Sequence, residues 1–353
     1  MAVAILQFEH RFRKVPVMKA IGYYQPLPID NAESLQDIEL PAPVAGTRDL
    51  LVRVKAVSVN PVDTKVRKNA APEAGQAKVL GWDAVGIVEA IGSGVANFKV
   101  GDRVYYAGSI IRPGANSELH AVDERIAAIA PKSLDDAQAA ALPLTTITAY
   151  ELLFDRLQVP KGGGAGQTLL ITGGAGGVGS ILIQLARQLT QLRVIATASR
   201  PETREWCLAL GAHVVIDHSK PLAAELKAAG IGEVDMVASL TQTEQHYAQI
   251  IESLKPQGQL AVIDDMKVLD AMPLKTKCIS LHWEMMFTRS RFTTPDIAEQ
   301  GALLAEVAAL VDAGRVRTTA NASFGTINAA NLQRAHALIE SGKAQGKVVL
   351  AGF

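Results

Sequence analysis

The sequence predicts a two-domain α/β protein in which a small β-barrel is followed by a doubly wound parallel sheet. Its 353 residues exceed the usual size of a single hydrophobic core. Residues 18–143 show the patterns of strands and loops, whereas short apolar runs alternate with helical patterns after Pro143. Strands that alternate with helices imply crossover connections, which produce a parallel sheet.

Three segments predict the strands of the barrel. In residues 51–59, apolar and polar residues alternate, as in a half-buried strand. Residues 79–92 are interrupted by glycines, which is typical of bulged strands that curl a sheet. Residues 100–107 supply a further turn and strand. Residues 1–17 precede the first strand pattern, and we expect an N-terminal extension there rather than a targeting peptide, because the apolar stretch is short and the basic residues follow it.

The second part of the chain follows the alternation of a parallel sheet. A helix is expected at residues 145–157, and another at residues 180–189, where apolar residues form one stripe. Further helices are expected at 202–210, 297–313 and 329–341. The expected strands are residues 168–172, 194–198, 214–216, 234–238, 259–263 and the closing segment 346–350.

Composition excludes several classes of protein. The 35 Lys and Arg residues balance 35 Asp and Glu residues, so no overall field favours nucleic acid or an anionic membrane. No apolar run reaches the roughly 18 residues that a membrane-spanning helix needs. The two cysteines, Cys207 and Cys278, argue against a disulfide framework and favour a reducing, cytoplasmic setting.

A glycine-rich turn predicts a dinucleotide site. The pattern Gly174-x-Gly176-x-x-Gly179 directly follows an apolar strand and opens an amphipathic helix, which is the context that the dinucleotide fingerprint requires. We expect Gly174 to permit the tight turn, Gly176 to admit the pyrophosphate and Gly179 to let helix and strand pack closely. The alternative is an empty structural loop. The predicted phosphate-binding residues are Gly174, Ala175, Gly176, Gly177, Val178 and Gly179.

The end of the second strand of this sheet predicts which dinucleotide binds. An NAD enzyme usually carries Asp or Glu there, whereas this chain has Ser199 and Arg200, with Arg204 one helical turn later. A hydroxyl and guanidinium groups can bind a 2′-phosphate through charge-assisted hydrogen bonds. We therefore expect NADPH, although both arginines could instead be solvated residues at a helix start.

The motifs taken together resemble the medium-chain dehydrogenase/reductase superfamily over residues 18–353, and within it the quinone oxidoreductases. The resemblance rests on the segments 59–63, 81–92 and 99–104, the glycine loop and the closing segment 346–350. It implies a GroES-like catalytic domain at residues 18–143 and 289–353, a Rossmann domain that binds NADPH at residues 144–288, and a homodimer. The segment 281–290 resembles a subgroup often labelled zinc-type alcohol dehydrogenase-like.

The residues at the positions of the family's zinc ligands do not fit that label. Asn60, Trp82 and Leu144 stand where zinc-dependent relatives carry ligands, and zinc requires thiolate, imidazole or carboxylate. Asp83 keeps the family's acidic position, but one carboxylate does not make a site. The four cysteines of the structural zinc lobe are also missing from the first domain. We expect a metal-independent reaction.

The resemblance also implies positions for catalytic residues, each with a structural alternative. Asn60 lies in a motif that faces the nicotinamide in relatives, or else it caps a turn. Lys65 stands where many quinone oxidoreductases carry Tyr; it could bind the ribose or donate a proton, or be a solvated surface lysine. Thr146 is either a nicotinamide contact or an ordinary helix residue.

Further cofactor contacts are expected at the carboxyl ends of the later strands, where ligands bind in open parallel sheets. His218 would lie against the adenine, with an ordinary loop histidine as the alternative. His282 could line the nicotinamide edge of the pocket, while its strand could instead form a subunit edge. The remaining candidates are Ser239, Leu240, Thr241, Ile263 and Asp264.

The leading hypothesis is a zinc-independent, NADPH-dependent oxidoreductase that transfers hydride to a quinone or an α,β-unsaturated carbonyl. Without a metal, hydride addition to an electron-poor alkene or quinone is the reduction best served by hydrogen bonds alone. The first alternative is a zinc-free alcohol or aldehyde reductase. The second, from another class, is a non-catalytic, crystallin-like protein that binds NADPH.

Overall fold

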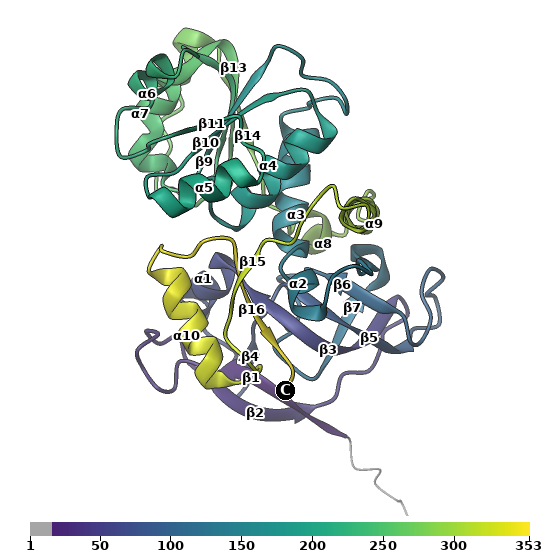
Figure 1. Cartoon of the computed structure of the whole chain (residues 1–353). Coiled ribbons are helices and arrows are strands. Elements are labelled where there is room, and N and C mark those ends of the chain that lie inside the picture. Colours follow the sequence, from purple (N-terminus) through teal and green to yellow (C-terminus); the bar gives the residue numbers. More distant parts are fainter. Residues whose placement is uncertain (1–15) are drawn as a thin grey trace, which may run out of the picture.

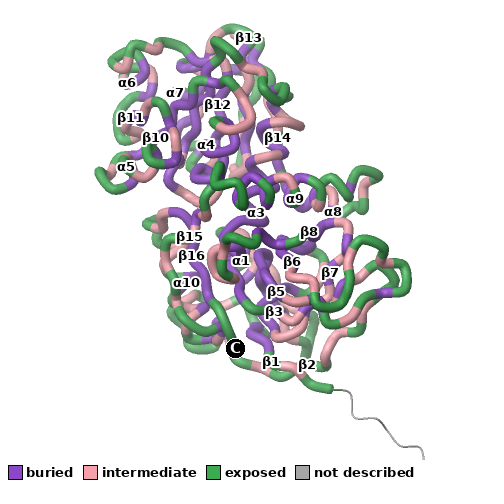
Figure 2. The backbone as a smooth tube through the Cα atoms, turned by 45° about the vertical axis from the view of Figure 1, so that its right-hand side comes forward, coloured by how far each residue is buried: buried purple, intermediate pink, exposed green. Residues whose placement is uncertain are grey.

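The computed structural model describes residues 16–353. It shows two lobes, one above the other in the view of Figure 1. The upper lobe contains the middle of the chain, and the lower lobe contains both β1 and the C-terminus. Figure 2 shows that the buried backbone runs through the centre of both lobes. The helices within residues 16–353 are too short or too polar to cross a lipid bilayer.

The upper lobe is the predicted doubly wound sheet. All of its strand pairs are parallel, in the order β11-β10-β9-β12-β13-β14, so the direction of winding reverses between β9 and β12. The strands are β9 (Thr168–Thr172), β10 (Arg193–Thr197), β11 (Val214–Ile216), β12 (Val234–Ser239), β13 (Leu254–Val262) and β14 (Ser280–Trp283). The helices are α4 (Gly177–Leu189), α5 (Pro201–Ala209), α6 (Leu222–Ala228), α7 (Thr243–Ser253) and η3 (Met272–Lys277).

The lower lobe is the predicted small barrel. One sheet has the order β15-β16-β3-β5-β6-β8, with β7 also paired to β3, and the other has the order β2-β1-β4. Its strands are β1 (Val17–Tyr23), β2 (Gln36–Pro41), β3 (Asp49–Val59), β4 (Lys78–Val79), β5 (Ala84–Ile91), β6 (Arg103–Tyr106), β7 (Leu119–Asp123), β8 (Ala127–Ile129), β15 (Ala320–Ser323) and β16 (Lys347–Ala351). Its helices are α1 (Pro61–Asn69), η1 (Glu124–Ile126), α2 (Asp136–Ala140) and α10 (Ala329–Glu340).

Two details of this lobe bear on the expectations. The segment 79–92 holds the end of β4 and the whole of β5, with Gly81 at φ 108° between them, and the pairing of β5 with β3 has the register shifts of bulged strands. The expected extension at residues 1–17 lies mostly outside the described residues, but Val17 already belongs to β1 and pairs with Pro41. The last strand, β16, pairs antiparallel with β3, so the C-terminus completes the sheet that the N-terminal half begins.

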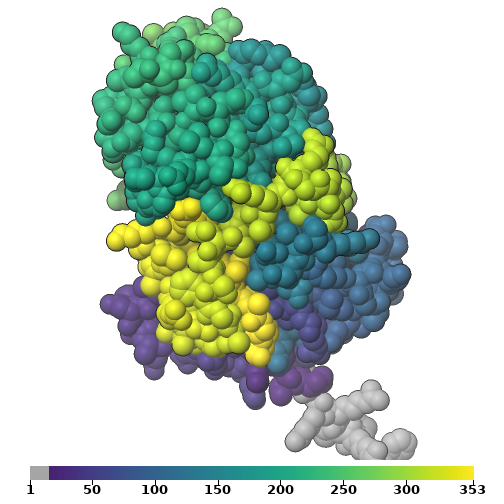
Figure 3. Space-filling model, viewed as in Figure 1, coloured from purple at the N-terminus to yellow at the C-terminus, as the bar shows by residue number. Residues whose placement is uncertain are grey.

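Two connections join the lobes. The first is α3 (Pro143–Tyr150), which continues as the π-helix η2 (Glu151–Arg156) and so covers the helix expected at 145–157. The return connection runs from β14 through α8 (Thr288–Phe292) to α9 (Glu299–Asp312), which packs against β8 and α3. Figure 3 shows the C-terminal segment, in yellow, on the lower lobe and against the upper one.

A buried pair of carboxyl groups ties the two connections together. Glu151 at the start of η2 and Glu284 directly after β14 are both buried and lie within hydrogen-bond reach of each other. Oε1 of Glu151 accepts from Gln300 Nε2 at 3.2 Å and forms an ion pair with Arg289 at 2.7 Å, and Oε2 of Glu284 accepts from Arg156 at 2.8 Å. The other oxygen of each carboxyl has no donor. Because two facing carboxylates repel, the pair is stable when it shares one proton.

We expect the substitution Glu284→Gln to stabilise the protein above neutral pH. Burial, and next the Glu151 carboxylate, raise the pKa of Glu284 from 4.5 to about 9. Between these values the folded chain holds a proton that the unfolded chain releases, so stability falls as pH rises, by at most about 1.4 kcal/mol per pH unit. The glutamine amide donates to Glu151 without needing that proton.

Thermal melting measured between pH 5 and pH 8.5 tests this expectation. The melting temperature of Glu284→Gln should exceed that of the wild type at high pH, by about 2–4 °C for each kcal/mol, and the difference should shrink towards pH 5. The exposed Glu299→Gln is the matched control and should show no such trend. Parallel pH profiles for wild type and Glu284→Gln would contradict the shared proton.

Candidate active site

The turn between β9 and α4 is built from glycines. Gly173 is the residue with the left-handed backbone, at φ 69°, so the expectation that Gly174 makes the tight turn is wrong. Gly174 is needed for close packing instead, because a Cβ there would lie 2.7 Å from Cβ of Ala196 and 3.1 Å from Sγ of Cys207. Gly173 is also tied down, since its N–H donates to Thr197 Oγ1 at 3.0 Å.

The rest of the loop has the shape of an anion cradle. Gly176 precedes α4, and a Cβ there would meet only the Gly173 carbonyl, at 3.4 Å, so its outer side is open. Gly179 lies at the crossing of helix and loop, where a Cβ would be 2.5 Å from the same carbonyl. The first N–H groups of a helix lack partners within it and attract an anion. The predicted residues Gly174, Ala175, Gly176, Gly177, Val178 and Gly179 all lie in this turn or in the first turn of α4.

The residues predicted to select the dinucleotide follow β10 but differ in their freedom. Ser199 is exposed, and Arg200 precedes α5 with its Nε 3.2 Å from the Glu202 carboxylate. Arg204 is not a solvated residue, because its guanidinium donates to two main-chain carbonyls, one after β10 and one in β11, at 3.2 and 2.8 Å. Ser199 and Arg200 are therefore the residues of this group that are available to a ligand.

The candidates after β12 and β13 divide in the same way. Ser239 Oγ lies 2.7 Å from Thr243 Oγ1, and the Asp264 carboxylate accepts from the Thr243 N–H at 2.9 Å, so both side chains hold the start of α7. Thr241 instead lies over the glycine loop, where its methyl group would be 2.8 Å from a Cβ on Gly173. The other two candidates of these strand ends, both partly buried, are Leu240 and Ile263.

Three predicted residues carry buried polar atoms with no partner among residues 16–353. Thr146 on α3 is fully buried, and its Oγ1 has no hydrogen bond. The same holds for Nδ1 of His218 and Nε2 of His282. The His218 ring also meets the ring of His246 edge-on, with 6.3 Å between centroids. Since buried polar groups are nearly always paired, these atoms are available to a ligand.

Asn60 lies in a buried network that sequence reasoning did not foresee. Its Nδ2 donates to Asp83 Oδ2 at 2.8 Å, and its Oδ1 accepts from the ammonium group of Lys347. The same ammonium donates to Asp83 Oδ2 at 2.9 Å and to the Val59 carbonyl at 3.1 Å. Asn60, Asp83 and Lys347 are all at least 97 % buried. Asn60 is thus both the N-cap residue of α1, in a capping box with Asp63, and a member of the buried network.

A second carboxyl group lies beside this network. Asp63 accepts from the Asn60 N–H at 2.7 Å and from the Gly81 N–H at 3.0 Å. Burial is the main reason why its pKa rises to about 7, and the nearby Asp83 adds to the rise, whereas Lys347 opposes it. Asp63 thus fixes the main chain at Asn60 while the Lys347 ammonium fixes its side chain.

Lys65 crosses from one lobe to the other. Its Nζ lies 2.8 Å from Asp265 Oδ2, in the segment after β13, although α1 belongs to the barrel. Both side chains are solvent-exposed, so the pair contributes at most about 1 kcal/mol. Lys65 is therefore exposed, and its side chain is held between the two lobes by a weak ion pair.

A zinc ion does not fit these residues. Trp82 is buried and donates its indole N–H to the Ser109 carbonyl at 3.2 Å, and Leu144 offers no ligand atom. The one carboxylate of the set, Asp83, is already bound to an ammonium group and to the Leu144 N–H. Across residues 16–353, no three His, Cys, Asp or Glu side chains are arranged to hold a metal. We therefore derive no step through zinc.

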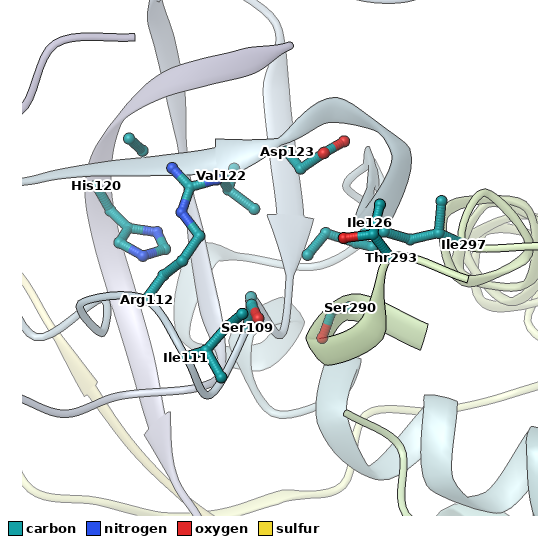
Figure 4. A pocket seen from close by; sticks show the side chains of 12 residues that line it. Ser109, Ile111, Arg112, His120, Val122, Asp123, Ile126, Ser290, Thr293 and Ile297 are labelled. Atoms are coloured by element: carbon teal, nitrogen blue, oxygen red, sulfur yellow. The ribbon is translucent and has the colours of Figure 1, made fainter. Parts of the chain in front are cut away.

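A cavity of about 140 Å³ lies next to Trp82, between the barrel and the α8–α9 segment (Figure 4). Ser109 and Ile111 line it from one side, and Ser290, Thr293 and Ile297 from the other. The buried Oγ of Ser109 has no partner. The lining combines apolar side chains and this hydroxyl group with Arg112 and Asp123, whose charges are paired with Asp49 and Arg125, so the cavity suits a small uncharged group.

His120 also lines this cavity but is not available as an acid. Burial lowers its pKa to about 4, so the imidazole is neutral near pH 7. Its Nε2 lies 2.9 Å from the Pro113 carbonyl and donates to it, and its Nδ1 accepts from the Tyr106 hydroxyl at 3.1 Å. Both nitrogens are thus occupied.

Lys347 is the main residue that sequence reasoning missed. From the sequence, Lys347 is expected only as part of the closing segment 346–350. A lysine at the start of a strand that continues with three buried apolar residues is a usable signal, because a buried ammonium requires partners. The identity of those partners, Asn60 and Asp83, depends on the pairing of β16 with β3.

Comparison with known proteins agrees with this architecture. A family model described as alcohol dehydrogenase GroES-like domain matches residues 46–129, and one described as zinc-binding dehydrogenase matches residues 210–350. A zinc-type alcohol dehydrogenase-like protein from Staphylococcus aureus is 39 % identical over 94 % of this chain and 99 % of its own length. An NADPH-dependent alkenal/one oxidoreductase from Arabidopsis thaliana is 39 % identical over 48 % of this chain and 45 % of its own length.

Solved structures give the same result. A putative zinc-dependent alcohol dehydrogenase from Rhizobium etli has a TM-score of 0.92 at 58 % identity, covering 96 % of this chain and 99 % of its own. A quinone oxidoreductase from Escherichia coli, complexed with NADPH, has a TM-score of 0.78 at 25 % identity, covering 94 % and 99 %. The chain belongs to the medium-chain dehydrogenase/reductase superfamily of oxidoreductases, among its zinc-type alcohol dehydrogenase-like proteins.

Proposed function

We propose that the protein is a zinc-independent, NADPH-dependent reductase of quinones or α,β-unsaturated carbonyl compounds. The observation that carries this proposal is the network of Asn60, Asp83 and Lys347. Asn60, which stands where zinc-dependent relatives carry a metal ligand, is held there by Asp83 and Lys347, and the three groups satisfy one another. A carbonyl group would therefore be polarised without a metal, which favours acceptors conjugated to an electron-poor double bond.

The cofactor assignment is supported by the open cradle at Gly176 and by the unpartnered atoms around it. The cradle suits the pyrophosphate, and the unpartnered Thr146 hydroxyl on α3 suits an amide such as that of nicotinamide. Ser199 and Arg200 suit a 2′-phosphate. The Arabidopsis and Escherichia coli relatives, whose descriptions name NADPH, support the same choice.

The chain's own residues would bind and orient rather than react. When bound, NADPH supplies a hydride to the β-carbon of the acceptor, and the α-carbon or oxygen then takes one proton. Among the described residues, the exposed Lys65 ammonium group, which lies between the two lobes, is the candidate for passing that proton from solvent. The cavity beside Trp82 would exclude water from the body of the substrate.

We also propose that two copies associate through the free edge of β14. Among residues 16–353 this strand pairs with β13 alone, and Trp283 in it and Met285 just after it are 52 % and 45 % exposed. An unpaired strand edge with apolar neighbours is a template for a second copy. We further propose a cytoplasmic setting, which the two free cysteines favour.

NADPH oxidation against a panel of quinones, enones and aldehydes is the experiment that tests the function. We expect turnover with quinones or enones, reduction of the C=C bond in enones, and unchanged rates after treatment with a chelator. Reduction of aldehydes alone would favour an alcohol or aldehyde reductase. Activity that disappears on chelation and returns with zinc would refute the proposal, and tight NADPH binding without any turnover would indicate a non-catalytic protein.

The substitution Arg200→Ala tests the preference for the phosphorylated cofactor. We expect the KM for NADPH to rise about tenfold or more while the KM for NADH changes little, because a charge-assisted hydrogen bond to the 2′-phosphate is lost. Arg193, exposed at the opposite end of β10, provides the matched control Arg193→Ala. Equal effects of Arg200→Ala on both cofactors would remove the argument for NADPH.

Two glycine substitutions separate cofactor binding from folding. Gly176→Ala has room within the protein, at φ −73°, and should keep the melting temperature while weakening NADPH binding at least about tenfold, because its methyl group would occupy the pyrophosphate side. Gly179→Ala would push against main-chain carbonyls and should lower the melting temperature itself. Calorimetric titration with NADPH measures the first effect. Unchanged affinity of Gly176→Ala would show that the loop is not the cofactor site.

A further inference from the structure

We propose that Lys347 is a positioning residue for hydride transfer, which fixes the walls of the nicotinamide site without touching substrate. This inference rests on the proposed function and deepens it, because it assigns a role to one residue of the buried network. Lys347 begins the last strand of the chain, 287 residues after Asn60, and it is 3 % exposed. Its side chain reaches three separate walls of the cleft.

The first wall is the loop that contains Asn60. An ammonium group only donates hydrogen bonds, so the Asn60 atom that faces Lys347 must be Oδ1. The amide nitrogen is thereby directed to Asp83 and, at 3.4 Å, to the Ser58 carbonyl. Without the ammonium group the amide could turn over, because the oxygen and nitrogen ends have nearly the same shape.

The second wall is the start of α3. Asp83 accepts from Lys347 through Oδ2 and from the Leu144 N–H through Oδ1, at 2.7 Å. Leu144 is the second residue of α3, and Thr146, with its unpartnered hydroxyl, follows in the same turn. The ammonium group thus holds the helix that presents Thr146 through one buried carboxylate.

The third wall is the start of α4. The Lys347 methylene groups lie against Gly177, where a Cβ would be 2.9 Å from Cδ of the lysine and 3.1 Å from the Thr145 methyl group. The residue before the lysine, Gly346, donates its N–H to the Ala175 carbonyl at 2.8 Å. The phosphate-binding turn is therefore seated directly on the lysine.

Lys347 itself is not a proton donor. Its three N–H groups are taken by Val59, Asn60 and Asp83, and its side chain is buried. Its effect on the reaction therefore passes through the groups that it holds. Because a displacement of about 1 Å between reacting groups costs on the order of 100-fold in rate, loosening these walls should lower kcat strongly.

The test uses the full chain and compares Lys347→Met with the double variant Asp83→Asn/Lys347→Met. The single variant leaves a buried carboxylate without its cation and should melt at a lower temperature, whereas the double variant removes both charges and should recover most of that loss. The double variant allows the proposal to be tested even if the single variant fails to fold. Lys55→Met, on the exposed side of β3, is the control.

Two readouts on the folded double variant separate positioning from a merely structural role. We expect kcat with the best acceptor to fall about 100-fold. We also expect the Kd of NADP⁺ by calorimetry to rise about tenfold, while the Kd of adenosine 2′-monophosphate, which reaches neither the phosphate-binding turn nor the nicotinamide site, stays within about twofold. Lys55→Met should change none of these values.

A folded double variant with wild-type kcat and wild-type affinity for NADP⁺ would overturn the role of Lys347 and leave the proposed function intact. Equal weakening of NADP⁺ and adenosine 2′-monophosphate would also overturn it, because the defect would then be general. If the wild-type protein neither binds NADP⁺ nor oxidises NADPH, the proposed function fails first, and this inference falls with it.

Discussion

A buried ammonium group constrains the region between the two lobes more than any other described interaction. Moving a charge out of water costs several kcal/mol unless partners replace its hydration. The partners of Lys347 come from β3, from the turn before β5 and from the start of α1, so the ends of these elements must meet at one point. The position of α3 follows, because its second residue donates to the same carboxylate.

The interactions between the lobes differ greatly in strength. Lys65 and Asp265 form an exposed pair at the mouth of the cleft, and such a pair separates at little cost. At the connections, Glu151, Glu284 and Arg289 are buried or nearly so, and breaking any of their contacts would leave a polar group without a partner. The contact between Lys65 and Asp265 therefore breaks more easily than the buried contacts at the two connections between the lobes.

The sequence is informative where local pattern determines structure. Five of the six strands of the parallel sheet, the loop at Gly176 and the helix after it follow from periodicity and glycine spacing, and they agree with the structure. The superfamily follows from the motifs. The side-chain contacts of the site do not, because they join residues that are far apart along the chain: Asn60 binds Lys347, and Lys65 binds Asp265.

A position at the end of a strand is also not enough to predict whether an individual residue is available to a ligand. Ser239 and Asp264 stand at the carboxyl ends of strands, yet both are used to hold Thr243, and Arg204 is bonded to main-chain carbonyls. Local sequence does not reveal such competition within the protein for hydrogen-bonding groups. Thr146 shows the opposite case, since its unpaired hydroxyl becomes visible only when its surroundings are known.

The return of the chain to the barrel has a consequence for how the molecule is assembled. β16 follows every other described strand in the sequence, yet it supplies both a strand beside β3 and the cation between the lobes. The parallel sheet is complete in sequence by Trp283, so it can form while the barrel still lacks a strand. Asp83 and Asn60 therefore lack their cation until Lys347 has been synthesised, and a chain that stopped before Lys347 would keep the nucleotide lobe but lose the centre of the candidate site.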